Sequence, residues 1–349
     1  MIEADILIIG AGPTGLFTVF EAGLLKLKCH LIDALPQPGG QCSEIYPKKP
    51  IYDIPGFPEV LAGDLTKNLL EQIKQFEPGF TLGERAETIE KQDDDSFIVT
   101  TNKGTKHHAP IVAIAGGLGS FEPRKPLLEN IDIYEGKGVE YIIKEPEFYR
   151  DKRVVISGGG DSALDWAIFL SNIASDVTLI HRRNEFRGAL DSVEKVQELK
   201  LLGKINIITP AEVTKLHGAD KIEAISIIKN SEEIYIETDH FIPLFGLSPK
   251  LGPIGKWGLD IEKNAIKVDT FDYQTNIPGI FAIGDVNSYP GKLKLILCGF
   301  HEATLMCQSA FKIINPGKKY VLKYTTVSGI NGFDGTRKEA PKAVVKAIN

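Results

Sequence analysis

Short apolar runs alternate with amphipathic stretches along the first part of this chain. The first run, residues 5–9, has the length and β-branching of a strand buried on both faces of a parallel sheet. A helical pattern follows over residues 16–25, and a second apolar run spans residues 29–32. Strand, helix and strand in this order predict a βαβ unit, in which the two strands lie parallel.

The turn between the first strand and the helix fits the pattern G-x-G-x-x-G. The first glycine permits a tight turn, the second lets the backbone approach a pyrophosphate, and the third lets the helix pack on the strand. Proline suits the first helical position, where its missing N–H loses no partner. The candidate binding residues of this turn are Gly10, Gly12, Pro13, Thr14 and Gly15. Asp33 lies about twenty residues further on, the separation at which a carboxylate reaches ribose hydroxyls, so we expect an ADP-type ligand here.

A loop rich in glycine and proline follows Asp33. It contains the adjacent Gly39 and Gly40 and then Gln41, and neighbouring glycines let the backbone come close to a large planar ligand. A plain turn is the alternative. The irregular stretch continues to residue 58, and its length indicates a functional loop. Beyond it the pattern predicts a helix near residues 61–76 and strands near residues 81–89, 96–101 and 111–114.

A second unit of the same kind begins at Arg153. The apolar run 154–156 leads into a turn that fits G-x-G-x-x-A, followed by a helix over 163–171 and a strand over 177–180. The candidate residues of this turn are Gly158, Gly160, Asp161, Ser162 and Ala163. The first unit ends in an acid, whereas this one continues with the basic residues His181, Arg182, Arg183 and Arg187.

The different ends of the two units predict different ligands. FAD has free ribose hydroxyls on its adenosine half, and Asp33 can accept hydrogen bonds from them. NADP carries a 2′-phosphate at that place, which repels a carboxylate and is bound by arginines through charged, forked hydrogen bonds. The first unit is therefore predicted to hold FAD and the second NADPH. A solvated charged face is the alternative for the arginine cluster.

The last third of the chain returns to the first unit. Mixed strand-like segments span residues 205–228, and residues 275–285 combine a turn, an apolar strand and a glycine–acid end at Asp285. A long helix follows near residues 295–314. We therefore predict an α/β fold with two Rossmann-like domains. Residues 1–115 and 241–349 form the FAD domain, with an extension from about residue 317, and residues 116–240 form the NADPH domain.

Composition narrows the class of protein. The 349 residues are 43% hydrophobic and 25% charged, which is ordinary for a globular protein of two or three domains. No apolar run approaches the roughly 18 residues that span a bilayer, and the N-terminal run lacks the basic residues of a signal peptide. Four cysteines, at no metal-ligand or C-x-x-C spacing, fit a reducing cytoplasm and predict no metal site: Cys29, Cys42, Cys298 and Cys307.

The formal net charge of −6 conceals a basic C-terminus. From Lys312 onward the chain has eight basic and two acidic residues, so the part before it is strongly acidic. An acidic protein is a poor candidate for general nucleic-acid binding. The basic tail is either a local docking surface or a solvated terminal segment.

Together these motifs resemble the flavoprotein reductases of the thioredoxin-reductase type, which have two dinucleotide-binding domains. The resemblance rests on both glycine turns, the basic cluster and residues 275–285, in that order, and it covers almost the whole chain. It implies that Asp285 binds the flavin ribitol. It also implies that the helix after Asp285 points its positive end toward the pyrimidine edge of the flavin.

The chain lacks the redox dithiol of that larger family. Thioredoxin reductases carry a C-x-x-C pair in the NADP domain, but no cysteine lies between Gly116 and Asp239. In reductases of the glutathione-reductase type a redox pair begins just after a Gly-Gly pair. Cys42 fills the first position of that pair, but the second falls on Pro47. We therefore expect Cys42 to be a packing residue.

A dithiol-free branch with a C-terminal extension matches more closely: the bacterial ferredoxin–NADP reductases of thioredoxin-reductase-like fold. Matching stretches include residues 35–37, 51–53, 56–58, 186–187 and 257–260. In that branch a loop tyrosine stacks on one flavin face, which implies Tyr46, with Tyr52 as a competitor. A residue of the C-terminal extension covers the other face, which implies Tyr324, with Thr326 beside it.

The resemblance also implies the reaction and the partners. NADPH passes a hydride to the flavin N5 atom, and the reduced flavin releases electrons singly to ferredoxin or flavodoxin, so no protein nucleophile is needed. The domains are expected to swivel, and we place the hinges at residues 115–118 and 239–244. A homodimer is expected by resemblance only. An acidic partner needs a basic patch, for which the candidates are Lys48, Lys49, Lys292, Lys294 and the tail lysines.

Two other functions stay open. One is a disulfide reductase for a low-molecular-weight thiol, of the bacillithiol-reductase type, and Cys42 is the one feature that favours it. The other is a flavin-binding redox sensor that does not turn over.

Overall fold

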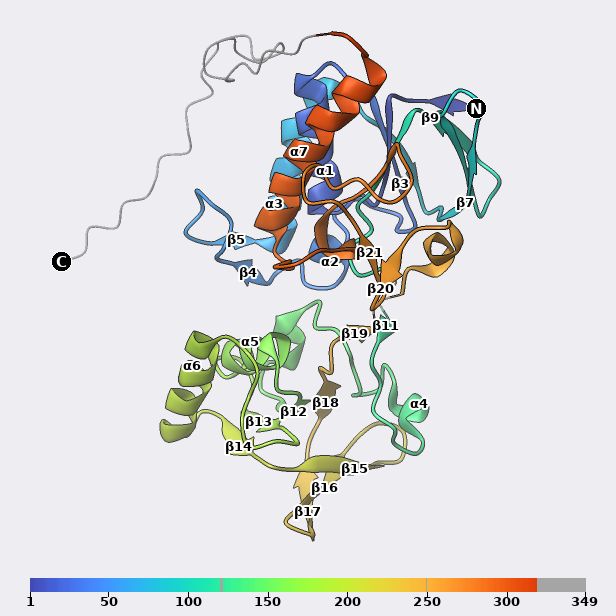
Figure 1. Cartoon of the computed structure of the whole chain (residues 1–349). Coiled ribbons are helices and arrows are strands. Elements are labelled where there is room, and N and C mark those ends of the chain that lie inside the picture. The colour runs from blue at the N-terminus through green and yellow to red at the C-terminus, as the bar shows by residue number, and fades with distance from the viewer. Residues whose placement is uncertain (120–121, 249, 319–349) are drawn as a thin grey trace, which may run out of the picture.

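A computed structural model of the chain describes residues 1–119, 122–248 and 250–318. These residues form two lobes, and the chain passes from the first lobe to the second and back (Figure 1). Two predicted site residues, Tyr324 and Thr326, lie outside the described residues. Within the described ranges, no helix has both the length and the apolar character that crossing a bilayer requires.

The first lobe is built on a five-stranded parallel sheet of order β22-β10-β2-β3-β6. Its strands are β2 (Ile6–Ile9), β3 (Cys29–Asp33), β6 (Gly79–Leu82), β10 (Ile111–Ile114) and β22 (Ile280–Ala282). Every residue of β2, β10 and β22 is buried, which explains their unbroken apolar runs. Because β22 completes a sheet that β2 begins, the first lobe is discontinuous in sequence.

Three long helices cover one face of this sheet: α1 (Pro13–Leu24), α3 (Ala62–Ile73) and α7 (Ile296–Ile314) (Figure 1). Their apolar sides share one core with Ile6 and Ile8 of β2. A 3-10 turn, η1 (Lys74–Phe76), continues α3, so the helix predicted near residues 61–76 is two helical segments.

A second, four-stranded sheet covers the opposite face. It has the order β1-β9-β8-β7, with β1 (Ile2–Glu3), β7 (Ala86–Lys91), β8 (Phe97–Thr101) and β9 (Lys106–Ala109). Leu7 and Ile9 of the parallel sheet pack there against Phe97 and Val99. The run predicted near residues 81–89 is therefore two strands, β6 and β7, that belong to different sheets.

Short elements complete the first lobe around the edge of the sheet. They are α2 (Gln41–Glu44), β4 (Pro50–Ile51), β5 (Val60–Leu61), η3 (Gly252–Lys256), β20 (Ile261–Glu262), β21 (Ala265–Lys267), η4 (Gly284–Val286) and β23 (Asn287–Ser288).

The second lobe has a four-stranded parallel sheet of order β14-β13-β12-β18. Its strands are β12 (Arg153–Ser157), β13 (Asp176–Ile180), β14 (Asn206–Ile208) and β18 (His240–Pro243). Helices α5 (Asp161–Leu170) and α6 (Leu190–Leu201) share one core with this sheet. The sequence pattern gave no sign of α6, because only Val196 and Leu199 of its twelve residues are buried.

An antiparallel sheet of three strands packs with the opposite face of the second lobe's parallel sheet, where Val155 and Phe241 meet Ile225 and Ile227. Its strands are β15 (Glu212–His217), β16 (Ala224–Lys229) and β17 (Glu232–Glu237). Two short helical segments, α4 (Ile131–Tyr134) and η2 (Pro146–Tyr149), precede β12.

A two-stranded antiparallel ribbon joins the lobes. It consists of β11 (Glu122–Pro123) and β19 (Leu247–Ser248), which lie between the lobes in Figure 1. Next to this pair, the Lys250 N–H donates to the Leu118 carbonyl at 3.1 Å. Gly119 has φ +81°, and a Cβ there would lie 1.8 Å from the Lys250 carbonyl oxygen. The two connecting segments therefore run side by side in close contact.

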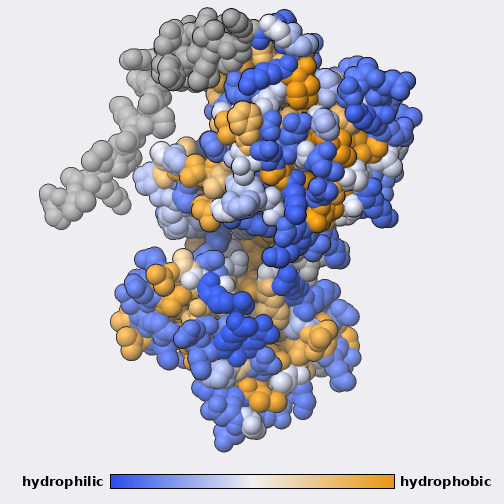
Figure 2. Space-filling view, in the orientation of Figure 1, coloured by the Kyte–Doolittle hydropathy of each residue, from blue (hydrophilic) through white to orange (hydrophobic). Residues whose placement is uncertain are grey.

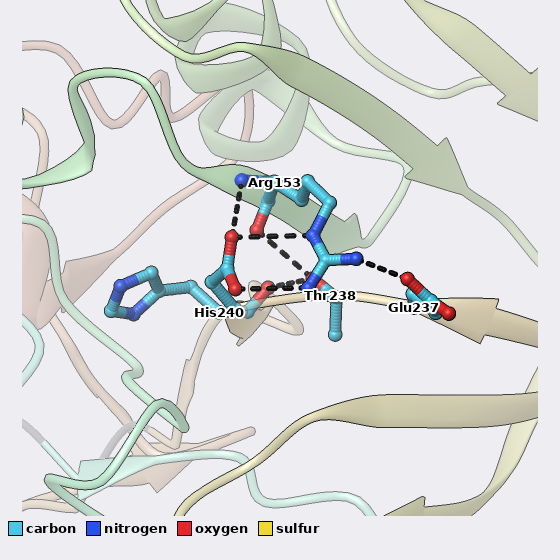
Figure 3. Close-up of polar contacts among 5 residues, drawn as sticks. Arg153, Glu237, Thr238 and His240 are labelled. Atoms are coloured by element: carbon cyan, nitrogen blue, oxygen red, sulfur yellow. Dashed lines mark hydrogen bonds and ion pairs between the residues drawn. The ribbon is translucent and has the colours of Figure 1, made fainter.

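The predicted hinge at residues 239–244 overlaps a strand of the second lobe. Residues 240–243 of the predicted hinge 239–244 form β18, which is buried and paired with β12. Asp239, just before this strand, accepts hydrogen bonds from the Arg153 backbone N–H at 2.9 Å and from its guanidinium at 3.0 Å. The Thr238 hydroxyl donates to the Arg153 and His240 carbonyls, and Glu237 binds the Arg153 guanidinium at 2.5 Å (Figure 3). The segment is thus fixed in the second lobe, and we move the proposed domain boundary from residue 241 to near residue 246.

Candidate functional site

A cavity of about 420 Å³ lies in the first lobe, beyond the carboxyl ends of β2 and β10. Nine of the residues predicted to bind FAD line it: Gly10, Gly12, Pro13, Thr14, Asp33, Gly40, Gln41, Tyr46 and Asp285. Ligands of open α/β sheets bind at this end of the strands. Residues that are far apart in sequence therefore converge on one cavity.

The first glycine turn has the tight geometry that its pattern predicts. Gly10 has φ +111°, and a Cβ there would lie 2.4 Å from the Ala115 carbonyl oxygen. A Cβ on Gly15 would lie 2.0 Å from the Gly10 carbonyl oxygen, so this glycine lets α1 approach the end of β2. Helix α1 begins at Pro13 with its N-terminal end at the cavity. The free N–H groups and the positive end of the helix favour a pyrophosphate there.

Asp33 is half-buried at the end of β3. Its carboxylate accepts hydrogen bonds from the Ala11 N–H at 2.7 Å and the Leu35 N–H at 2.9 Å. Burial raises the pKa of Asp33, and these two hydrogen bonds oppose the rise. A carboxylate has about four acceptor sites, so two remain for hydroxyl donors in the cavity.

A second glycine segment faces the first across the cavity. Gly40 has φ +56°, and a Cβ there would lie 3.2 Å from Gly12 Cα. The two backbones therefore approach more closely than side chains would allow. This narrow cradle fits the predicted dinucleotide, and Gln41 extends its lining as the first residue of α2.

Tyr46 occupies the border between the cavity and the second lobe. It lines the cavity and also packs against the core of the second lobe, and the Lys49 ammonium lies 5.9 Å from its ring centroid. Tyr52, the competing candidate, is 66% exposed and is not part of the cavity lining. The geometry therefore favours Tyr46 for stacking on a flavin.

Cys42 lines the same cavity but is a buried thiol in contact with the Tyr46 hydroxyl. Burial raises the pKa of Cys42 to about 11, against the opposing effect of the hydrogen bond with Tyr46. The thiolate is the nucleophilic form of cysteine, and the raised pKa keeps most of this thiol protonated near neutral pH. All four cysteines are free thiols.

Asp285 enters the cavity from η4, directly after β22. Burial raises its pKa, and the positive charges of Lys292 and Lys294 oppose this. Ile296, the first residue of α7, also lines the cavity, so the positive end of this helix faces it.

Sequence reasoning missed part of the lining. Arg85 and Ala86 contribute from the junction of β6 and β7, and residues 250–254 contribute from the returning segment. The prediction of a single strand over residues 81–89 hid the break between β6 and β7, next to which Arg85 lies. The glycine at position 83 was the available signal for that break.

The second glycine turn lies in the second lobe, between β12 and α5. A Cβ on Gly158 would lie 2.7 Å from the Ala163 side chain, and Gly160 caps α5. The Asp161 carboxylate accepts a hydrogen bond from the Ala189 N–H at 2.7 Å, while Ser162 is exposed. None of these residues lines the first-lobe cavity, so the two predicted nucleotide sites are separate.

The basic cluster after β13 divides into two environments. Arg182, Arg183 and Arg187 are exposed, whereas His181 is only 5% exposed and lies under the glycine turn. A Cβ on Gly159 would lie 2.3 Å from the His181 ring. Burial, reinforced by the positive charges of the three arginines, lowers the pKa of His181. The three arginines are thus open to solvent, and the His181 ring lies against the glycine turn.

The imidazole of His181 keeps one free polar atom. Its Nε2 is buried and has no hydrogen-bond partner among the described residues. A buried polar atom without a partner is costly, and a bound nucleotide beside the turn would supply one.

Three ion pairs join the loop around Tyr46 to the second lobe. Lys48 binds Glu145 at 2.5 Å, Lys49 binds Asp165 at 2.7 Å, and Glu44 binds Lys144 at 2.6 Å. Lys48 and Lys49 thus already have acidic partners in the second lobe, which weakens their case as docking residues for an acidic partner.

Lys292 is a poor docking candidate, because its side chain is only 7% exposed and is bonded to Glu302. Lys294 stays exposed, and most of the tail lysines lie outside the described residues. On the face seen in Figure 2, hydrophilic residues are mixed with scattered apolar residues over both lobes.

Comparison with known proteins agrees with this architecture. The family model of the pyridine nucleotide-disulphide oxidoreductases matches residues 4–303. A ferredoxin–NADP reductase from Flavobacterium johnsoniae is 80% identical over 349 residues and covers 100% of both chains. One from Mesorhizobium japonicum is 51% identical over 330 residues, which is 94% of this chain and 96% of the relative.

Solved structures confirm the predicted fold class. Thioredoxin reductase from Lactococcus lactis has a TM-score of 0.78 at 25% identity and covers 89% of this chain and 99% of its own. Bacillithiol disulfide reductase from Staphylococcus aureus has a TM-score of 0.74 at 21% identity, covering 88% and 98%, and shows the fold alone. The chain belongs to the pyridine nucleotide-disulphide oxidoreductase family and, within it, to the ferredoxin–NADP reductases.

Proposed function

We propose that this chain transfers electrons between NADPH and ferredoxin through FAD held in the first-lobe cavity. The observation that carries the proposal is the convergence of the first glycine turn, Asp33, Tyr46 and Asp285 on one cavity without a reactive thiol. Full-length relatives at 50–80% identity carry the name ferredoxin–NADP reductase.

FAD supplies the chemistry when bound, because it accepts a hydride and gives up electrons one at a time. The residues of the chain bind and orient it. Asp33 would accept hydrogen bonds from ribose hydroxyls, the N-terminus of α1 would face the pyrophosphate, and Asp285 would accept from the ribitol. Tyr46 would cover one face of the flavin and exclude water from it. Tyr324 stays proposed for the other face and Thr326 as a cofactor-binding residue; both lie outside the described residues.

The second lobe presents NADPH. The backbone of residues 158–163 and the N-terminus of α5 hold the pyrophosphate, and Arg182, Arg183 and Arg187 hold the 2′-phosphate. Since this site does not border the flavin cavity, the lobes must swivel about the β11–β19 ribbon to bring the nicotinamide to the flavin. The ion pairs at Glu44, Lys48 and Lys49 oppose that motion.

The finer assignments of partner and assembly rest on the family resemblance. We propose flavodoxin as a second acceptor, a homodimer as the assembly and the cytoplasm as the location. The exposed Lys294, with lysines of the tail, supplies positive charge for an acidic partner.

Steady-state NADPH oxidation with ferredoxin, flavodoxin and a bacillithiol disulfide, assayed side by side, tests the proposal. We expect turnover with ferredoxin, unchanged in a Cys42→Ala variant. Turnover with the disulfide that Cys42→Ala abolishes would overturn the proposal in favour of a disulfide reductase. Bleaching of the flavin by NADPH without steady turnover on any acceptor would indicate a sensor.

A further inference from the structure

Glu302 is a fully buried carboxylate on α7, and the proposed function assigns it no role. Its Oε2 accepts hydrogen bonds from the Gly284 N–H at 2.6 Å and from the Asn287 side-chain amide at 2.8 Å. Its Oε1 accepts from the Tyr289 hydroxyl at 2.8 Å and from the Lys292 ammonium. All four acceptor sites of the carboxylate are thus filled by donors from residues 284–292.

These four donors belong to the segment that carries Asp285 into the flavin cavity. Gly284 directly precedes Asp285, and both line the cavity. Gly284 has φ +75°, and a Cβ there would lie 3.0 Å from the Thr14 hydroxyl, so the turn sits tightly against the first glycine turn. A movement of Glu302 would therefore move Asp285.

The ion pair between Glu302 and Lys292 is also unusual in its burial. The two side chains are 0% and 7% exposed, whereas the other described ion pairs of the first lobe include at least one side chain that is more than a quarter exposed. Burying two charges costs more free energy than a well-packed apolar pair of the same size. Simple packing of α7 therefore does not explain why charged residues occupy these positions.

We propose that Glu302 is a positioning residue for Asp285, and that Glu302 and Lys292 together balance the charge at the ribitol end of the FAD site. The inference rests on the proposed function. Glu302 fixes the turn through the Gly284 N–H, and Lys292 neutralises a carboxylate that would otherwise face Asp285 across a buried space.

Three variants test the pair: Glu302→Gln, Lys292→Met and the two combined. The readouts are the FAD dissociation constant from reconstitution of the apoprotein, the midpoint potential of the bound FAD, and the unfolding temperature of the apoprotein. The exposed pair Glu262–Lys267, in the same lobe, supplies matched controls as Glu262→Gln and Lys267→Met.

We expect each single variant to weaken FAD binding on the order of tenfold, because a buried charged hydrogen bond is lost. Reduction adds negative charge to the flavin. Glu302→Gln should therefore raise the potential, Lys292→Met should lower it, and the double variant should return toward the parent. The two controls should change neither quantity.

A purely structural role would shift the unfolding temperature of the apoprotein and would move both single-variant potentials in the same direction, or in neither. That result would overturn the inference, as would FAD affinity equal to the parent in both single variants. If the parent protein itself bound no FAD, the proposed function would fail instead.

Discussion

The two glycine turns of this chain share a backbone pattern and differ in what surrounds them. At the first, Asp33 is half-buried and its carboxylate is fixed by two backbone N–H groups inside a cavity. At the second, Arg182, Arg183 and Arg187 stand exposed at the end of β13. The N-terminal and the returning C-terminal parts of the first lobe both line the cavity of the first site. The arginines of the second site are open to solvent.

We expect this difference to separate a resident cofactor from an exchanging substrate. Three separate segments contribute to the cavity lining, among them Gly12, Gly40 and Asp285, and such a cavity should bury much of a bound ligand and slow its release. An exposed cluster of arginines binds a phosphate through charge and lets it leave quickly. On the proposed function, the same βαβ unit would serve two kinetic roles, set by the residues around it rather than by the turn itself.

The largest expected effect comes from removing the arginines. The double variant Arg182→Ala/Arg183→Ala should lower kcat/KM for NADPH by about a hundredfold, since each hydrogen bond to a charged phosphate contributes about 1.5–3 kcal/mol. The value for NADH, which has no 2′-phosphate, should change little. Steady-state kinetics with both nucleotides measure this, with Arg150→Ala as an exposed control in the same lobe. Equal losses for both nucleotides would contradict the assignment.

Replacing Asp33, the acid at the end of β3, should affect the binding of FAD instead of NADPH. Asp33→Asn should weaken FAD binding by about tenfold, because an amide accepts ribose hydroxyls less strongly than a carboxylate. KM for NADPH in the reconstituted enzyme should stay unchanged. Flavin titration of the apoprotein measures the first effect. Asp5→Asn is the control, because Asp5 also accepts from a backbone N–H, that of Lys28 at 2.7 Å, but lies outside the cavity.

A smaller effect is expected where the lobes meet. Reversing one charge of an interlobe pair, in Lys144→Glu, should speed flavin reduction by NADPH about two- to fivefold, since it frees the lobes to swivel. The combined variant Glu44→Lys/Lys144→Glu should restore the parent rate. Stopped-flow absorbance at low ionic strength measures both rates. A slower or unchanged rate in the single variant would argue against the pairs as a restraint.

The smallest effect concerns the second lobe's own stability. Arg153 lowers the pKa of Asp239 through a hydrogen bond, so the ionised carboxylate stabilises the fold above the ordinary pKa of about 4. This stabilisation is lost as the pH falls through the lowered pKa. Asp239→Asn should therefore be less stable at pH 7 and show a shallower loss toward acid. Denaturant unfolding between pH 3 and 7 measures it, and an unchanged acid slope would refute the role.

Much of this arrangement was predictable because its signals are local. Strand β10 matches its predicted bounds, and β3 and α7 differ from theirs by one residue, since buried parallel strands and a long helix have strong apolar patterns. Glycine spacing located both turns.

Long-range contacts were beyond the reach of the pattern. From the sequence we predicted Lys48 and Lys292 to be free for docking. In the structure each has an acidic partner at least ten residues away. Residues 240–243 are close to proline and glycine residues that usually interrupt a strand. Only their pairing with β12 shows that they form one. Arg85 lines the cavity, but no sequence motif around it indicated this. The sequence marks where the backbone turns, but not which distant side chains meet there.

Anaerobic titration of the purified protein with NADPH, followed by addition of oxidised ferredoxin, tests the central claim most directly. The account predicts a yellow protein whose flavin absorbance is bleached by NADPH far more readily than by NADH and recovers as ferredoxin is reduced. A colourless protein, or one bleached equally by NADH, would contradict it.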